Sequence, residues 1–386
     1  MIKVEVKKQL ISWARERAGL EVRDLIKPFP KFHEWEDGTS FPTLKQLEKL
    51  ATRLCAPLGY FFLPAPPEER LPLKDFRTVS NDLIEQPSPN LLDTVFSMQQ
   101  RQAWYKEFII DEGAGPLTFV GSATTQNSPE QIASDIRRIL AMNPGWASLI
   151  PTWTEALNEL RVKVEDAGIL AVWNGSVGNN THRKLDTDEF LGFVLSDPYA
   201  PLIFINNADF KARQMFTLAH ELAHVWLGSV GVLNFQNLNP VDSDVEQFCN
   251  KVAAEFLMPK DEAIEAWKSA KDSPDPFQLI ARRFKVSPLV AGRRALDLGR
   301  ITKQQFFDFY NAYWDNERRK MAAARKKGGG GDFYANCDFR IGRPFAEAIM
   351  RATHEGKLLY REAYKLTGLS GTTFDKYIRL VGSEGR

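Results

Sequence analysis

Apolar residues recur at two different spacings along the chain, and each spacing predicts a different kind of element. They lie three to four residues apart in residues 8–66, in three segments of 91–165 and through most of 244–320, which predicts helices. Three short runs rich in Val, Ile and Phe predict strands, namely GILAVWNG, EFLGFVLSD and APLIFINN. This order predicts an α+β protein that is mostly helical and contains a small β-sheet.

Stretches rich in Pro and Gly divide this pattern into domains. The segment PAPPEERLPLKDF is typical of an extended linker, and KKGGGGD is typical of a flexible one. A chain of 386 residues is long enough for several domains. We predict a small helical domain over 1–66, a linker over 67–90, a larger domain over 91–320, a second linker over 321–332 and a helical domain over 333–386.

The charge of the chain is balanced overall but unevenly distributed. The formal net charge is +1, yet residues 281–386 contain 22 Lys and Arg against 11 Asp and Glu. Such an excess indicates contact with a polyanion or an acidic partner, or docking on the acidic remainder of the chain. Both alternatives stay open from the sequence.

Three isolated cysteines and the absence of long apolar stretches indicate where the protein resides. Cys55, Cys249 and Cys337 are far apart and form no CxxC pair, which fits a reducing compartment. The N-terminal residues do not form a signal peptide, and no apolar run approaches the length of a membrane span. We therefore expect a cytoplasmic protein without membrane contact.

The segment FTLAHELAHVWLG, residues 216–228, places His220, Glu221 and His224 in an otherwise apolar helix. Residues four apart on a helix share a face, so both imidazoles can reach one small cation. Buried histidine and glutamate are costly without partners. A zinc ion would satisfy the two histidines, and its water would satisfy Glu221. The alternatives are a buried helix with two satisfied core histidines and a purely structural zinc site.

A third ligand is expected from the next helix, because catalytic zinc usually has three protein ligands and one open position. In VEQFCNKVAAEFLMP, residue Glu246 opens a stripe in which the small Cys249 and Ala253 allow close packing. We predict zinc held by His220, His224 and Glu246. Glu221 is then the predicted catalytic base, which takes a proton from water as it attacks a peptide carbonyl.

Several segments resemble the ImmA/IrrE group of bacterial zinc metallo-endopeptidases. They are HELAH, EQFCNKVAAEFLMP and INNADFKARQMFTLA, within a likeness that covers roughly residues 160–300. The chain departs from the usual pattern at Cys249, where alanine is usual, and at Phe256, where leucine is common. The resemblance implies His220, His224 and Glu246 as zinc ligands and Glu221 as the catalytic base. It also implies a protein substrate, such as a repressor or a partner in a toxin–antitoxin or phage-defence locus.

The N-terminal segments WARERAGL and FHEWEDGTSFPTLKQLEKLA are similar to the Xre-type helix-turn-helix domains that precede such peptidases in one long subgroup. DNA is therefore a candidate partner. However, the candidate base-reading positions hold Lys31, Phe32 and His33, and the acidic residues that follow oppose contact with phosphate.

Two further segments resemble a helix-turn-helix. The first, IARRFKVSPLVAGRRALDLG, follows the predicted peptidase core, and support of that core is its favoured role. The second, REAYKLTGLSGTTFDKYIR, has Gly368 in the turn. Tyr364 stands where alanine usually allows the helices to pack closely, so the match is imperfect. The basic C-terminal third is the better nucleic-acid candidate.

Two functions follow from these patterns. The first is a zinc-dependent endopeptidase that cleaves a specific regulatory protein. The second is a DNA- or toxin-binding transcriptional regulator or antitoxin whose metal site is structural or vestigial.

Overall fold

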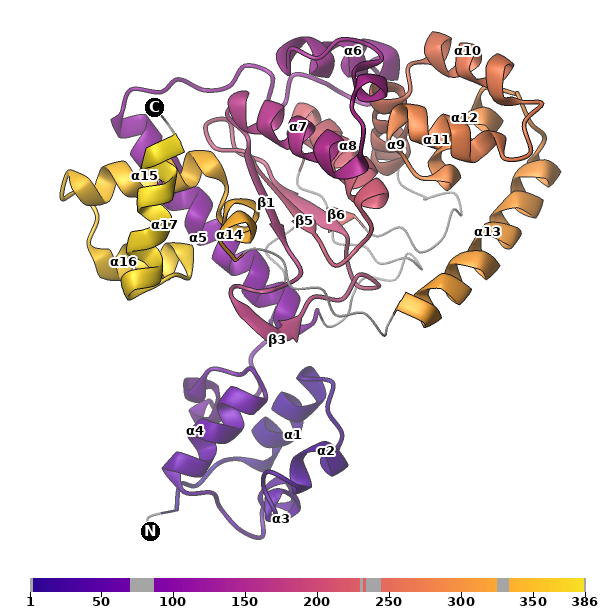
Figure 1. The fold of residues 1–386 in the computed structure, drawn as a ribbon. Helices are drawn as coiled ribbons and strands as arrows, with labels where there is room; N and C mark the ends of the chain where they lie inside the picture. Colours follow the sequence, from indigo (N-terminus) through magenta and orange to yellow (C-terminus); the bar gives the residue numbers. More distant parts are fainter. Residues whose placement is uncertain (1–2, 70–86, 230–231, 234–243, 325–332, 385–386) are drawn as a thin grey trace. The chain divides into compact units, whose positions relative to one another are not determined.

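The computed structural model describes residues 3–69, 87–229, 232–233, 244–324 and 333–384 (Figure 1). Its contacts divide the chain into two compact units. The first comprises Met1–Lys74 and Asp82–Phe96, and the second comprises Asp75–Asn81 and Ser97–Arg386. Most of the predicted linkers 67–90 and 321–332 lies outside the described residues. Residues 321–324, which were predicted to begin the second linker, instead form the end of helix α13 (Lys303–Ala324).

The first unit contains a bundle of short helices: α1 (Lys8–Arg17), α2 (Val22–Ile26), α3 (Phe32–Asp37), α4 (Leu44–Arg53) and the 3-10 helix η1 (Leu58–Phe62). Helix α4 begins with a capping box in which Thr43 accepts a hydrogen bond from the backbone of Gln46. Phe32 is 0% exposed and belongs to the core. The expectation that Phe32 occupies a base-reading position is therefore wrong, because its ring does not reach the surface.

A small mixed sheet lies in the second unit, with strand order β1-β5-β4-β6. Strand β1 (Leu170–Asn174) is parallel to β5 (Leu202–Asn206), and β4 (Gly192–Leu195) is antiparallel to β5. Every residue of these three strands is buried, which explains their continuous apolar runs. The prediction of a mostly helical α+β fold with a small sheet is confirmed.

Two further strand pairings were not predicted from the sequence. Strand β6 (Val232–Leu233) pairs with the free side of β4, opposite Gly192 and Phe193. Strands β2 (Ser176–Val177) and β3 (Asn180–Lys184) form a separate hairpin. Strand β6 has two residues and β3 is polar, so neither shows an apolar alternation.

Helices α8 (Lys211–Leu227) and α9 (Asp244–Leu257) lie side by side, and α8 packs on β4 and β5 (Figure 1). Nearly all of α8 is buried, from Gln214 to Trp226 with the exception of Phe216. Such a helix is apolar on most of its circumference because each of its faces meets protein. Helix α6 (Pro129–Ile139) covers α9, and α7 (Trp153–Asp166) contacts α8 and β1.

Four helices come next in the chain, and one of them, α12, contacts α9 directly. They are α10 (Lys260–Ala270), α11 (Pro276–Phe284), α12 (Pro288–Asp297) and α13 (Lys303–Ala324). Arg294 of α12 is buried and forms an ion pair with Glu255 of α9. Its guanidinium also donates to the carbonyl of Met258, at 3.1 Å. The buried charges are thus paired and hydrogen-bonded, as burial requires.

The C-terminal helices are α14 (Phe333–Ile341), α15 (Arg343–His354), α16 (Tyr360–Thr367) and α17 (Gly371–Glu384). The long helix α5 (Pro89–Asp111) connects to them through Arg101. The Arg101 guanidinium donates to the carbonyls of Arg340 and Leu366, at 2.7 and 2.9 Å. These carbonyls belong to the last turns of α14 and α16, where backbone oxygens lack helical partners. No helix among the described residues is long and apolar enough to cross a membrane.

Candidate metal centre

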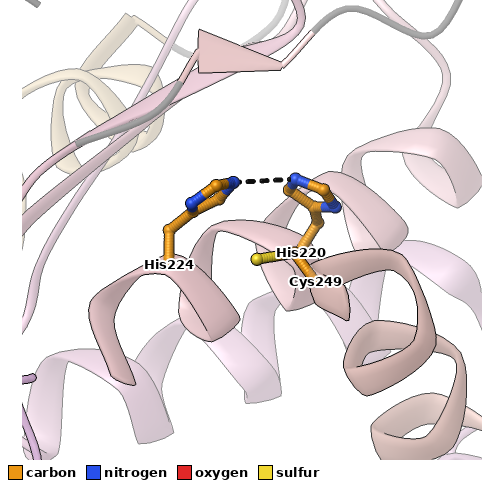
Figure 2. Close-up of side chains that lie close together, drawn as sticks. All are labelled: His220, His224 and Cys249. Carbon is orange, nitrogen blue, oxygen red and sulfur yellow. Dashed lines mark hydrogen bonds between the residues drawn. The ribbon is translucent and has the colours of Figure 1, made fainter. Parts of the chain in front are cut away.

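Two imidazoles face each other on the buried side of α8. His220 and His224 lie one helical turn apart, and their Nε2 atoms are 3.0 Å apart (Figure 2). His220 is completely buried and His224 almost completely. The four-residue spacing produces this arrangement because it places both side chains on one face.

Glu246, in the first turn of α9, reaches both rings. Its Oε2 lies 3.0 Å from Nε2 of His220, and its Oε1 lies 3.2 Å from Nε2 of His224. The structure therefore brings together the three side chains that the sequence predicted as ligands. Glu246 keeps 23% of its side chain exposed, whereas both imidazoles are buried.

The spacing of these atoms fits a small tetrahedral ion. Ligands at about 2.0–2.1 Å from a tetrahedral zinc lie roughly 3.3 Å from one another. The two Nε2 atoms are 3.0 Å apart, and each lies 3.0–3.2 Å from a different oxygen of the Glu246 carboxylate, Oε2 for His220 and Oε1 for His224. A donor set of two imidazoles and one carboxylate is also typical of catalytic zinc.

The opposite ring nitrogens have partners of their own. Nδ1 of His220 lies 3.0 Å from Oδ1 of Asn250, and Nδ1 of His224 lies 2.9 Å from Oγ of Ser229. An amide oxygen only accepts hydrogen bonds, so Nδ1 of His220 donates the proton. The lone pair of this ring is then on Nε2, which faces His224 and Glu246. Metal-binding histidines are usually fixed in this manner.

The protonation states of these residues suit a metal ligand set. Burial lowers the pKa of His220, even though the hydrogen bond and charge of Glu246 act in the opposite direction. For Glu246, burial alone would raise the pKa. The hydrogen bonds and charges of His220 and His224 together outweigh burial and hold the pKa of Glu246 well below its usual range. Neutral imidazole and ionised carboxylate are the forms that bind a metal.

Cys249 is a second candidate for the third ligand. It lies on α9 below the two rings (Figure 2), and the ligand atoms of His220, His224 and Cys249 all lie within 4.8 Å of one another. Burial, followed by the charges of Glu246 and Glu221, raises the pKa of the Cys249 thiol. The sequence interpretation treated Cys249 only as a small packing residue. Its membership of this cluster follows from its position three residues after Glu246, which is on the same face of α9.

Glu221 is fully buried next to this cluster. Both of its carboxylate oxygens lack a hydrogen-bond partner among the described residues. Burial, and then the negative charge of Glu246, raises the pKa of Glu221. A buried carboxyl group without a partner is costly. A cation and an attached water beside Glu221 would supply the partner that the described residues do not.

Gly192 of β4 makes room for Glu221. A Cβ atom at this position would lie 2.8 Å from Cγ2 of Thr217 and 3.3 Å from Oε1 of Glu221. The backbone oxygen of Phe204 would be 2.9 Å away. The close approach of β4 to α8 thus depends on the absence of a side chain. His182, the histidine of the predicted strand region, lies exposed on β3.

Two parts of the chain match known families. Residues 165–296 match the IrrE N-terminal-like domain, Peptidase_M78, and residues 341–379 match a domain of unknown function, DUF8813. No curated protein matches the chain. Neither matched range includes residues 1–66, so these matches lend no support to an Xre-like domain there. Residues 165–296 therefore carry an IrrE N-terminal-like peptidase domain, and together with the site at His220 and His224 this match indicates a metallopeptidase.

Proposed function

We propose that this protein is a zinc-dependent endopeptidase that hydrolyses a peptide bond in a specific regulatory protein. One observation carries the proposal. Two buried imidazoles and the Glu246 carboxylate converge at ligand distances, and a second buried carboxyl group, Glu221, lies beside them without a hydrogen-bond partner in the described part of the chain. A structural zinc site needs four protein ligands but no spare carboxylate, so the extra Glu221 favours catalysis.

Each residue of the site has a distinct role in this proposal. His220, His224 and Glu246 would hold zinc, and Asn250 and Ser229 would orient the rings of His220 and His224. Bound zinc supplies a Lewis acid that activates water and polarises the substrate carbonyl.

Glu221 would hold the proton that the attacking water releases. As the bond from the water oxygen to the carbonyl carbon forms, the proton moves to a Glu221 oxygen. Glu221 then gives it to the leaving amine nitrogen as the carbon–nitrogen bond breaks. The reaction is balanced by one water and requires no oxidant or further cofactor. Burial of Glu221 keeps bulk water from competing for that proton.

The restriction to a specific regulatory protein is supported by the resemblance to the ImmA/IrrE group. The substrate class proposed here is a repressor or a partner protein of a toxin–antitoxin or phage-defence locus.

The substitution Glu221→Gln tests the proposal, because the amide keeps the shape of the side chain but does not accept the proton. Wild-type protein, Glu221→Gln and an exposed control, Glu265→Gln, would each be incubated with a lysate of the source cells. New protein N-termini would then be counted by mass spectrometry. We expect discrete new N-termini with wild type and control, a loss of at least 100-fold with Glu221→Gln, and bound zinc in all three. Equal cleavage by Glu221→Gln, or none by wild type holding zinc, would contradict the proposal and favour a regulator with a vestigial site.

A further inference from the structure

The C-terminal helices α16 and α17 form a second feature that the peptidase chemistry does not use. Helix α16 ends at Thr367, three residues follow, and α17 begins at Gly371. Gly368 caps α16 with a positive φ of 71°, a conformation that favours glycine. Two helices joined by a three-residue turn that contains glycine form the supersecondary unit of a helix-turn-helix.

The buried residues of α16 and α17 form a common core with helix α15. Ala363 and Thr367 of α16, Leu369 of the turn, and Phe374 and Tyr377 of α17 are all buried. Helix α15 packs against both helices and completes a three-helix core. Phe374 and Tyr377 place one side of α17 in this core, and the other side of α17 faces away from the core.

Tyr364 does not disrupt this unit, although a smaller residue was expected at its position. Its ring packs edge-on against Phe374, with the ring centres 5.1 Å apart, and Tyr360 packs on both rings. The aromatic cluster therefore fills the space between α16 and α17. Tyr364 is thus accommodated by contacts with other aromatic rings of the unit.

The outer surface of the unit carries several polar and basic side chains. Ser370, Gly371, Thr372 and Arg379 are exposed along the start and outer side of α17, and Arg361 and Lys365 are exposed on α16. Arg361, Lys365 and Arg379 form no ion pair with any residue in the described part of the chain. By contrast, Arg351 and Lys357 elsewhere in the same domain pair with Glu112, which directly follows the end of α5.

We propose that α16 and α17 bind double-stranded DNA, with α17 lying in the major groove. The major groove admits one α-helix, and the first turns of the second helix of a helix-turn-helix contact the base edges. Small residues at the start of α17 let its backbone approach the DNA closely, and Thr372 can bond a base or a phosphate. Arg361 and Arg379 supply the positive charge that binds phosphates. Asp375 of α17 and Glu362 of α16 are exposed acidic groups of the same unit, and a carboxylate on α17 can accept from the amino group of cytosine.

The hydrogen bonds by which Arg101 and Asn179 attach this unit to other described parts of the second compact unit do not involve the proposed surface. Arg101 binds the C-terminal carbonyls of α14 and α16, and Asn179 of the β2–β3 turn donates to the carbonyl of Gly368 at 2.6 Å. These contacts lie on the turn and the helix ends. DNA on the outer side of α17 would not have to displace them.

Fluorescence anisotropy with the full-length protein tests this proposal. The probes are a labelled 30-base-pair DNA duplex of mixed sequence and a double-stranded RNA of equal length. The variant Arg361→Glu/Arg379→Glu reverses two charges on the proposed surface. The control Lys268→Glu/Lys271→Glu makes the same change on exposed residues at the end of α10. A neutral variant, Arg361→Gln/Arg379→Gln, provides a milder change, and circular dichroism verifies that all variants are folded.

We expect wild-type protein and the α10 control to bind the DNA with Kd values on the order of 10⁻⁶–10⁻⁴ M at physiological salt, and more tightly as salt is lowered. Charge reversal should weaken binding at least tenfold, and neutralisation should weaken it less. RNA should bind more weakly than DNA, because the deep, narrow major groove of A-form RNA does not admit a helix. No DNA binding by wild type, equal loss in the α10 control, or equal binding of RNA would overturn the proposal. Binding of an acidic protein in place of DNA would do so as well. None of these measurements depends on zinc or on cleavage.

Discussion

Asn250 Oδ1 lies 3.0 Å from Nδ1 of His220, which fixes the tautomer of the imidazole on the buried side of α8. Asn250 lies on α9, one turn beyond Glu246, so one helix supplies both a candidate ligand and the group that orients another. Nε2 of His220 can therefore bind a cation without rotation of the ring or a change of tautomer.

Replacing Asn250 by alanine should weaken zinc binding without unfolding the protein. Loss of the group that orients a metal-binding histidine typically costs about 10–100-fold in metal affinity. Competition with a chromogenic chelator measures this change. Lys251→Ala, at an exposed position on the same helix, is the matched control and should bind zinc as the wild type does. Equal affinities in both variants would show that Asn250 does not orient His220.

Adding a single methyl group at Gly192 should disturb both stability and catalysis. The new Cβ would meet Thr217 and the backbone oxygen of Phe204 at 2.8 and 2.9 Å, and the backbone does not yield easily. Overpacking of this kind costs about 1–3 kcal/mol, which lowers the Tm by roughly 2–4 °C per kcal/mol in a domain of this size. Gly115→Ala is the control because its Cβ would meet nothing within 4 Å. A Gly192→Ala protein as stable and as active as this control would contradict the close packing of β4 on α8.

Glu165 should make the stability of the second unit depend on pH. Burial raises the pKa of Glu165 to about 7, although the charge of Arg161 and the backbone of Arg343 act to lower it. The unfolded chain releases this proton near pH 4.5, so the folded state binds more protons between these two values. Stability should therefore fall as pH rises from about 4.5 through about 7, by at most about 3 kcal/mol.

Thermal unfolding between pH 5 and pH 8 measures this dependence. The variant Glu165→Gln does not titrate, so its Tm should vary less with pH than that of the wild type. The exposed Glu159→Gln variant should keep the wild-type slope. Identical slopes for all three proteins would show that Glu165 does not hold a proton in the folded state.

The sequence alone predicted the residues that converge in the candidate site, because helical spacing determines which side chains share a face. His220 and His224 follow from a spacing of four. Glu246 follows from its place in the first turn of a helix with a small-residue stripe that allows close packing on α8. The three buried strands were also predictable, since strands covered on both sides are apolar throughout.

Other features depend on contacts between segments that are distant in sequence. The pairing of β6 with β4 rests on backbone hydrogen bonds, which two residues of sequence do not reveal. The partner of Nδ1 in His220 depends on how α8 and α9 are rotated against each other. Phe32 was assigned to a base-reading position from the resemblance to a helix-turn-helix, but tertiary packing turns its side chain into the core.

The zinc content of two variants tests the account of the site most directly. Wild-type protein, Glu246→Gln and Cys249→Ser would be purified without added metal and dialysed against a weak chelator. The zinc content of each protein would then be measured by elemental mass spectrometry. The proposed ligand set predicts roughly one zinc per chain in the wild type and in Cys249→Ser, and a large loss in Glu246→Gln. Full zinc in Glu246→Gln together with its loss in Cys249→Ser would contradict the proposed ligand set.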